Sequence, residues 1–261
     1  MPTITRDGAP LYYEVHGTGH PVFFIHGGGG NTLAWYQQIP YFKDKYKCIP
    51  VDLRGFKNST WPAEQFHPKY YPDDMRAIMD AEGIKTAAFV CQSLGAWAGL
   101  PIAVYTPERV SCLFMNGSPT PAYSAENWKL MERANPIFMS KEFSRGEGVG
   151  WNRETLKTRP ELVFLYSQIK QLNPPGLNPL KMQADEVKIH PEHLNGYKVP
   201  TMLCGGAHDD FLIPGSHIHS ASLIPGCSTY TFPNSGHSAY FEQAEQFNKV
   251  AAEFLARHVP T

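Results

Sequence analysis

The stretch Thr86 to Ala98, TAAFVCQSLGAWA, decides the fold. An apolar run typical of a buried strand leads into Cys91-Gln92-Ser93-Leu94-Gly95, and a helix-forming segment follows. A serine on a tight turn between a strand and a helix needs small residues two positions before and after it, because larger side chains would collide with the neighbouring backbone. Cys91 and Gly95 meet that need, although glycine is usual at both positions. In the alternative interpretation, Ser93 is an ordinary helix N-cap.

Length and composition fit one large α/β domain. The chain has 261 residues, 42% of them hydrophobic and 18% charged, which is enough for a sizeable core. A formal net charge of −1 offers no basic surplus for nucleic acid. The first residues lack the layout of a signal peptide, and no apolar run approaches the roughly 18 residues of a membrane helix. We therefore expect a cytoplasmic protein that acts on a small molecule, without nucleic acid or membrane as partner; whether it forms a homodimer stays open.

The cysteines are odd in number and show no CxxC spacing; they are Cys48, Cys91, Cys112, Cys204 and Cys227. Four of them lie in or beside predicted strands, which favours small buried side chains over disulfides or metal ligands. We expect neither a metal ion nor a cofactor.

Predicted strands alternate with predicted helices along most of the chain. Apolar or alternating runs predict strands at 11–15, 21–25, 46–52, 110–115, 201–205 and 228–233, in addition to the run before Ser93. Helical spacing covers 71–82 and 242–258. This alternation predicts a mostly parallel sheet covered on both faces. From 119 to 198 only helical stretches occur, so we expect an inserted helical lid over the carboxyl ends of the strands, with 1–118 and 199–261 forming the core.

A glycine-rich loop, His26-Gly27-Gly28-Gly29-Gly30, follows the predicted strand at 21–25. Consecutive glycines let the backbone take conformations closed to other residues, so that N–H groups can point at an incoming oxygen. A phosphate-binding loop would end in Lys and Ser or Thr, whereas Asn31-Thr32 follows here. We favour a loop that stabilises an anion over a phosphate cradle or a merely flexible loop.

Two more polar groups follow later strands. Asp209 and Asp210 come after the strand at 201–205, and His237 comes after the strand at 228–233. With Ser93 they give the chain order Ser, Asp, His, which is the order of a catalytic triad built on this sheet topology.

The combined segments resemble the α/β-hydrolase family over nearly the whole chain. The resemblance lies in HGGGGNTLAW (26–35), VDLRG (51–55), CQSLGAWAGL (91–100), TPERV (106–110), VPTMLCGGAHDDFLIP (199–214) and FPNSGHSAYFEQAEQFN (232–248). In detail the chain is similar to small capped members that include enol-lactonases, meta-cleavage-product hydrolases and esterases. The resemblance implies the α/β-hydrolase fold, with a helical cap inserted into it.

The resemblance also assigns roles. Ser93 would be the nucleophile, His237 the general base, and one aspartate of the 209/210 pair would orient the imidazole. Position relative to the proline that ends the loop selects Asp210, whereas counting from the preceding glycine selects Asp209. We adopt Asp210 as the catalytic acid and Asp209 as a residue that braces the loop.

Further roles follow from the same resemblance. Backbone N–H groups of Gly28 and Leu94 would form the oxyanion hole. His26 would be structural, with its ring bonded to backbone near the glycine loop. Independently of the resemblance, Asp52 and Arg54 are interpreted as a pair that braces a loop, because a charge just past a strand end is usually solvated or paired. Most aromatic side chains of the lid should pack against the sheet, and the residues that we expect to contact substrate are Gly29, Trp128, Phe138, Trp151 and Phe211.

Serine rather than aspartate at position 93 argues against dehalogenase or epoxide-hydrolase chemistry, in which a carboxylate attacks carbon. An apolar lid without an obvious arginine clamp favours a carboxylesterase or lactonase that cleaves a small apolar or aromatic substrate through an acyl-enzyme on Ser93. A C–C bond hydrolase is an alternative, although meta-cleavage hydrolases usually show Gly-Asn where this chain has Cys91-Gln92. A cofactor-independent oxygenase or lyase, with His237 as base, also stays open, as does a ligand receptor that does not hydrolyse its ligand.

Overall fold

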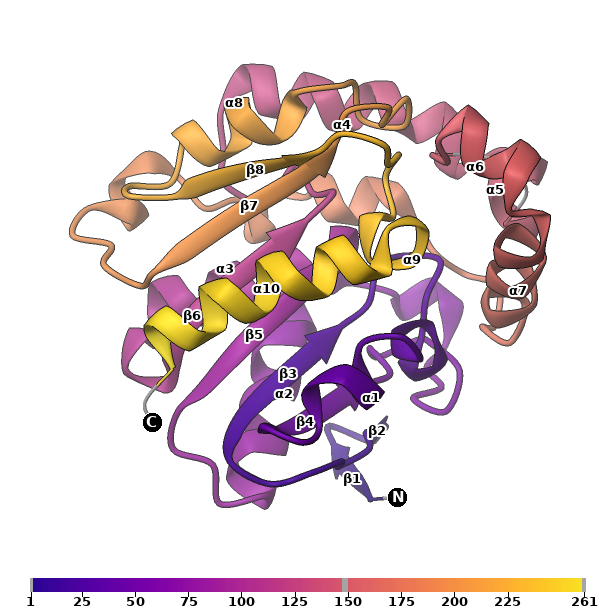
Figure 1. The fold of residues 1–261 in the computed structure, drawn as a ribbon. Coiled ribbons are helices and arrows are strands. Elements are labelled where there is room, and N and C mark those ends of the chain that lie inside the picture. Colours follow the sequence, from indigo (N-terminus) through magenta and orange to yellow (C-terminus); the bar gives the residue numbers. More distant parts are fainter. Residues whose placement is uncertain (1, 147–149, 260–261) are drawn as a thin grey trace.

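A six-stranded parallel sheet forms the centre of the computed structural model, which describes residues 2–146 and 150–259 (Figure 1). Its strand order is β4-β3-β5-β6-β7-β8, so the strand that leads to Ser93 lies inside the sheet. The strands are β3 (His20–Ile25), β4 (Tyr46–Val51), β5 (Ala87–Gln92), β6 (Val110–Asn116), β7 (Thr201–Gly206) and β8 (Ser228–Phe232). Every predicted strand of this sheet is present within one or two residues of its expected bounds.

A separate antiparallel pair, β1 (Thr3–Arg6) and β2 (Ala9–Tyr12), precedes the main sheet. The sequence did not predict β1, because its residues TITR are half or fully exposed and give no apolar run. The strand expected at 11–15 corresponds to β2, which begins two residues and ends three residues earlier than expected.

Helices cover both faces of the sheet. One face packs against α2 (Tyr71–Ala81), α3 (Ala96–Tyr105) and α8 (Ser216–Ser222). The other packs against α1 (Ile39–Phe42), α9 (Ala239–Glu242) and α10 (Ala244–His258), which crosses the front of the sheet in Figure 1. Alternate residues of β5 serve the two layers: Phe89 joins the first core, and Ala88 and Val90 join the second.

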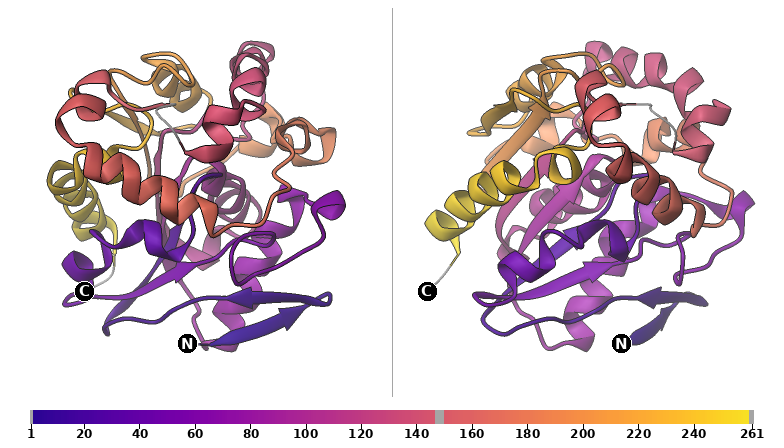
Figure 2. Two further views of the ribbon diagram at one scale, coloured as in Figure 1. Left: turned by 90° about the vertical axis from the view of Figure 1, so that its right-hand side faces the viewer. Right: turned by 45° about the vertical axis from the view of Figure 1, so that its right-hand side comes forward.

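A helical insertion lies between β6 and β7, beyond the carboxyl ends of the strands (Figures 1 and 2). It contains α4 (Ala125–Phe138), α5 (Lys141–Arg145), α6 (Arg153–Thr158) and α7 (Pro160–Gln171). Three of these helices begin at side-chain caps that accept a backbone N–H, supplied by Ser124, Ser140 and Asn152. The predicted fold class, a mostly parallel sheet flanked by helices with a helical insertion, is confirmed.

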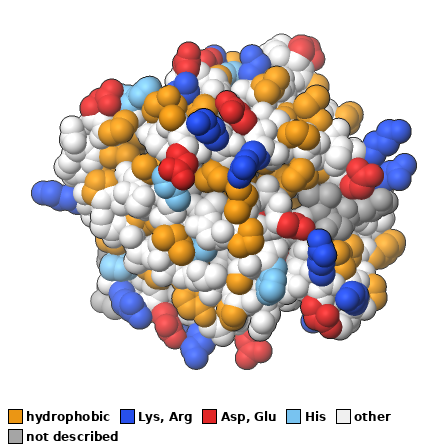
Figure 3. Space-filling view, turned by 90° about the horizontal axis from the view of Figure 1, so that it is seen from above, with side chains coloured by type: hydrophobic (Ala, Val, Ile, Leu, Met, Phe, Trp, Pro, Cys, Tyr) orange, Lys and Arg blue, Asp and Glu red, His pale blue; other side chains and the backbone are white. Residues whose placement is uncertain are grey.

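The cysteines and the surface agree with an ordinary globular chain. All five thiols are free, and the four on β4, β5, β6 and β7 are buried, as expected. The face seen in Figure 3 mixes hydrophobic, basic and acidic side chains. Among the described residues, no helix has the length and apolar character needed to cross a membrane.

Candidate active site

Ser93 sits on a strained turn between β5 and α3. It begins the short 3-10 helix η4 (Ser93–Gly95) with φ of +48°, a left-handed conformation that few non-glycine residues adopt. A Cβ added to Gly95 would lie 2.5 Å from the carbonyl oxygen of Ile25, so the turn packs tightly on the end of β3. Such strain persists where the surrounding structure holds it, and it is concentrated at functional sites.

Cys91 departs from the usual glycine, and Gly99 compensates for it. A Cβ on Gly99 in α3 would lie only 2.6 Å from the sulfur of Cys91. The larger side chain before the serine is therefore accommodated by a missing side chain one helical turn into α3. The pair keeps the strand-to-helix turn compact.

His237 is hydrogen-bonded to Asp209, not to Asp210. Its Nδ1 lies 2.9 Å from Asp209 Oδ2, and because a carboxylate only accepts, Nδ1–H is the donor. The other carboxylate oxygen, Oδ1, accepts the backbone N–H groups of Phe211 and Leu212 at 3.0 and 3.1 Å. Asp209 is 3% exposed, so both of its oxygens are used inside the protein.

The expected pairing of Asp210 with His237 is therefore wrong. Asp210 is exposed, and the hydrogen bond and ion pair recorded for the imidazole go to Asp209. The physical reason is the turn that follows β7: the amides of Phe211 and Leu212 close over the first aspartate of the pair and fix it. The first aspartate consequently faces inward and the second faces solvent.

The backbone of His237 is held from behind by two amide side chains. Gln92, the residue before Ser93, donates from Nε2 to the His237 carbonyl oxygen at 3.0 Å. Asn116, at the end of β6, donates from Nδ2 to Gln92 Oε1 at 2.6 Å and to the same carbonyl at 3.3 Å. Sequence reasoning missed this network, because Gln92 and Asn116 look like ordinary strand ends. It joins the histidine loop directly to the serine turn.

Among the described residues no hydrogen bond joins the Ser93 hydroxyl to His237, and the two residues line separate small cavities that share Phe211. The ring of Phe211 lies against the His237 imidazole at 4.7 Å between centroids and also lines the small cavity beside Ser93. With Nδ1 bonded to Asp209, Nε2 is the ring nitrogen available to the serine. Such contacts are often loose in unliganded enzymes and tighten with substrate.

His26 anchors the glycine loop, as predicted. Its Nδ1 bonds the Gly27 carbonyl oxygen at 2.7 Å, and its Nε2 accepts the N–H of Leu53 at 3.0 Å. The side chain is completely buried, and burial lowers the pKa of His26 to about 4. The imidazole is therefore neutral and joins the loop after β3 to the loop after β4.

Asp52 and Arg54 both brace loops, but not as a pair with each other. Asp52 accepts the N–H of Thr32 at 2.7 Å, whereas Arg54 forms a buried ion pair with Asp74 of α2 at 2.5 Å. Their predicted bracing role is confirmed, and their predicted pairing is wrong.

The glycine loop lies against the serine turn. A Cβ on Gly27 would be 3.0 Å from Ser93 Cβ, so the two loops are in contact. The N–H of Gly28 has no hydrogen-bond partner among the described residues. An unpaired backbone donor at this position can receive an oxygen of a ligand. Gly29 lies against Tyr166 of α7, whose hydroxyl would be 2.5 Å from an added Cβ.

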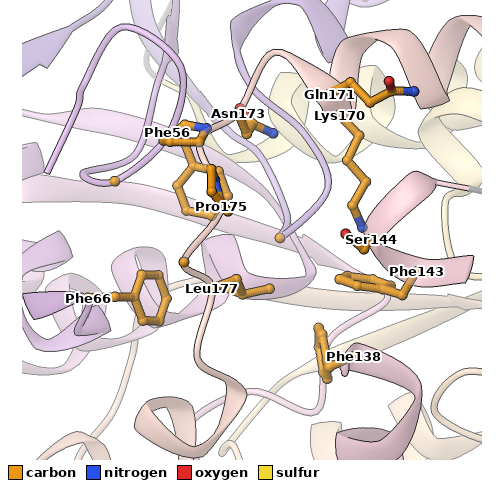
Figure 4. A pocket seen from close by; sticks show the side chains of 14 residues that line it. Phe56, Phe66, Phe138, Phe143, Ser144, Lys170, Gln171, Asn173, Pro175 and Leu177 are labelled. Carbon is orange, nitrogen blue, oxygen red and sulfur yellow. The ribbon is translucent and has the colours of Figure 1, made fainter. Parts of the chain in front are cut away.

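Three cavities surround a trio of phenylalanine rings, Phe138 of α4, Phe143 of α5 and Phe211 after β7. An outer cavity of about 310 Å³ reaches from Gly28 to Phe138 and Phe143 (Figure 4). A serine cavity of about 10 Å³ is lined by Ser93, Phe138 and Phe211, and a histidine cavity of about 30 Å³ by His237, Phe143 and Phe211. The ring centroids are 4.7 to 5.9 Å apart.

The serine cavity has room for about one water molecule. A larger acyl group therefore reaches Ser93 only when rings of the phenylalanine trio move aside.

Phe138 and Phe211 were expected to contact substrate, and their positions fit that expectation. Trp128 and Trp151 line none of these three cavities. Trp128 donates to the Gln183 carbonyl oxygen, and Trp151 packs between Tyr166 and Phe241, so both are packing residues of the insertion.

A buried lysine of the insertion was not anticipated. Lys170 on α7 lines both the outer and the histidine cavity and is only 9% exposed. Burial lowers its pKa to about 7. A signal was present in the sequence: Lys170 follows Tyr166 by four residues, which places it on the inward face of the predicted helix.

The chemistry of the site rests on its polar groups. In the described residues, no three His, Cys, Asp or Glu side chains gather in a way that could hold a metal ion. The polar groups at the sheet edge include a serine, a histidine bonded to a buried aspartate, and the Gly28 N–H, which is unpaired within the described chain. This set is suited to nucleophilic attack on a carbonyl group.

Comparison with known proteins defines the class. The family model described as alpha/beta hydrolase fold matches residues 20–244, and the chain belongs to that family. It is 27% identical to the 2-hydroxy-6-oxononadienedioate/2-hydroxy-6-oxononatrienedioate hydrolase of Comamonas testosteroni, over 92% of this chain and 89% of the relative. It is 25% identical to 3-oxoadipate enol-lactonase 2 of Acinetobacter baylyi, over 98% of this chain and 96% of the relative. A solved thermophilic esterase from Thermogutta terrifontis shares the fold, with a TM-score of 0.82 and 23% identity over 98% of this chain and 97% of the esterase.

Proposed function

We propose that this protein is a serine hydrolase that cleaves the ester or lactone bond of a small apolar or aromatic substrate. The observation that carries the proposal is the bonded pair of His237 and buried Asp209, whose histidine backbone is hydrogen-bonded to Gln92, the residue before Ser93 on its strained turn. An imidazole whose Nδ1–H is held by a carboxylate keeps Nε2 free to take a proton. Apolar rings around the serine cavity favour an apolar or aromatic acyl or leaving group.

The reaction proceeds in two steps. The Ser93 oxygen attacks the substrate carbonyl carbon while His237 Nε2 takes the hydroxyl proton, and the carbonyl oxygen becomes an oxyanion. The N–H groups of Gly28 and Leu94 stabilise that oxyanion, and each such donor contributes about 3 kcal/mol. The leaving alcohol receives the proton from His237, and an acyl ester remains on Ser93. Water, activated by the same imidazole, then attacks the acyl ester and releases the acid.

A panel of esters and lactones tests the proposal with the wild type, Ser93→Ala and His237→Ala. Each variant should lower kcat/KM by several orders of magnitude while the circular dichroism spectrum stays unchanged, because the two side chains act as one unit. Ser111→Ala and His20→Ala are matched controls. They remove a serine–histidine contact of 3.0 Å near the amino ends of β3 and β6, at the edge of the sheet opposite the candidate site. Undiminished hydrolysis in Ser93→Ala or His237→Ala would refute the proposal.

Cleavage of a C–C bond next to a carbonyl is the second candidate, favoured by the likeness to hydrolases of 2-hydroxy-6-oxo-dienoates. The same panel therefore includes 2-hydroxy-6-oxo-6-phenylhexa-2,4-dienoate, the compound named for another relative. A kcat/KM for this compound above that of every ester and lactone would favour the C–C reaction. A fluorophosphonate that labels Ser93 would argue against an oxygenase or lyase in which Ser93 only donates a hydrogen bond.

A further inference from the structure

Lys170 is a buried basic side chain of the insertion. It lies near the end of α7, is 9% exposed, and has its Nζ 3.1 Å from the centroid of the Phe143 ring. Within residues 2–146 and 150–259, no carboxylate oxygen lies within the 4.0 Å of an ion pair. A ring face stabilises an ammonium by a few kcal/mol at most, which is less than the cost of removing it from water.

The position of Lys170 relates it to the site. Among the described residues that line the outer cavity, Lys170 is the only one with a charged side chain. It also lines the histidine cavity, together with His237. Figure 4 shows the side chain extending towards Ser144 and the ring of Phe143. A group bound against its ammonium would therefore lie beside the cavity that His237 also lines.

Two asparagines fix this end of α7 to the glycine loop. Asn31 donates from Nδ2 to the carbonyl oxygen of Ile169 at 2.8 Å. Asn173 donates from Nδ2 to the carbonyl oxygen of Gly30 at 3.0 Å. Lys170 lies between the two bonded positions, so its backbone is held against the glycine loop.

We propose that Lys170 binds a carboxylate of the substrate, so that the preferred ester or lactone has an apolar or aromatic body with a carboxylate remote from the scissile bond. This inference rests on the function proposed above and refines its purely apolar substrate. A carboxylate balances one ammonium charge, whereas a phosphate dianion would bring a second, unmatched charge into a nearly closed space. The lowered pKa agrees, because an amine near its pKa at neutral pH gains its proton when an anion binds beside it.

Matched substrate pairs test the inference. 4-Acetoxybenzoate and 4-acetoxybenzamide differ in the charge of the leaving group, and monophenyl terephthalate and phenyl 4-carbamoylbenzoate differ in the charge of the acyl group. The wild type should prefer the anion in at least one pair. Lys170→Met should raise KM for that anion about 10- to 100-fold, which is the contribution of a hydrogen bond to a charged group. The KM for the matching amide should change by no more than about twofold. Lys157→Met, an exposed lysine of α6, is the control and should change neither.

A binding measurement separates this inference from the hydrolase proposal. Calorimetry with Ser93→Ala, which needs no turnover, should show tighter binding of terephthalate monoamide than of terephthalamide, and Lys170→Met in that background should abolish the difference. Equal binding of the two compounds, with esters still cleaved through Ser93, would overturn the role of Lys170 alone. Glu147 lies outside the described residues, so Glu147→Gln is also assayed. An anion preference that is absent from the wild type and appears only in Glu147→Gln would assign the lysine to an internal ion pair and overturn the inference.

Discussion

At the scale of single residues, two adjacent aspartates have opposite environments. Asp209 is buried with its carboxylate shared between His237 and two backbone amides, and Asp210 is exposed. The sequence left the choice open because each aspartate matches the family pattern from a different landmark. Only the path of the turn after β7 decides which side chain faces the imidazole.

The two aspartates allow a matched test. Asp209→Asn should lower kcat about 10⁴-fold, because an amide in that place no longer holds the imidazole in the required tautomer. Asp210→Asn is nearly the same chemical change one residue away and should leave kcat within a few fold. Steady-state kinetics on one ester measures both. A larger loss in Asp210→Asn than in Asp209→Asn would show that the catalytic acid is Asp210 after all.

At the scale of elements, a buried histidine fixes the loop that carries the expected oxyanion donor. His26 links the glycine loop to the loop after β4 through two backbone hydrogen bonds and packs edge-on against Phe56 at 4.8 Å. Protonating the ring would place a donor on Nε2, opposite the Leu53 N–H. Acid should therefore weaken this link.

The consequence is a pH dependence of the free energy of unfolding. Because the folded pKa of about 4 lies below the ordinary 6.5, the unfolded chain binds the proton more readily, and stability is lost as the pH falls from 6.5 towards 4. Between pH 7 and pH 5 the loss from this residue is about 2 kcal/mol. Urea unfolding at both pH values should show that His26→Gln loses less stability than the wild type.

Exposed His208 supplies the control for that measurement. His208→Gln should keep the full pH dependence of the wild type, since it leaves the buried His26 and its two backbone hydrogen bonds in place. Identical pH dependence in the wild type and His26→Gln would contradict the burial of a neutral His26.

At the scale of the whole molecule, the sheet, its flanking helices and the insertion were predictable because strands and helices alternate with clear periodicity. Strand β1 was missed because TITR lacks an apolar pattern. The pocket was predicted only in part. Aromatic composition marks the insertion but does not separate rings that pack, such as Trp128 and Trp151, from rings that line a cavity, such as Phe138.

The same limit applies to the polar groups. Ser93 and His237 follow strand ends and are visible in sequence, whereas Gln92, Asn116 and Lys170 gain their roles from contacts across the fold. The chain order brings three distant segments to one sheet edge, at the ends of β5, β7 and β8. The site therefore exists only in the complete fold.

Covalent labelling measures that convergence most directly. A fluorophosphonate is mixed with the wild type, Asp210→Asn, Asp209→Asn and Ser93→Ala, and the adduct is located by peptide mass spectrometry. We predict a single adduct on Ser93, formed quickly in the wild type and Asp210→Asn, slowly in Asp209→Asn, and absent in Ser93→Ala. An adduct on another residue, or equal labelling with and without the Ser93 hydroxyl, would contradict the assignment of Ser93 as the nucleophile.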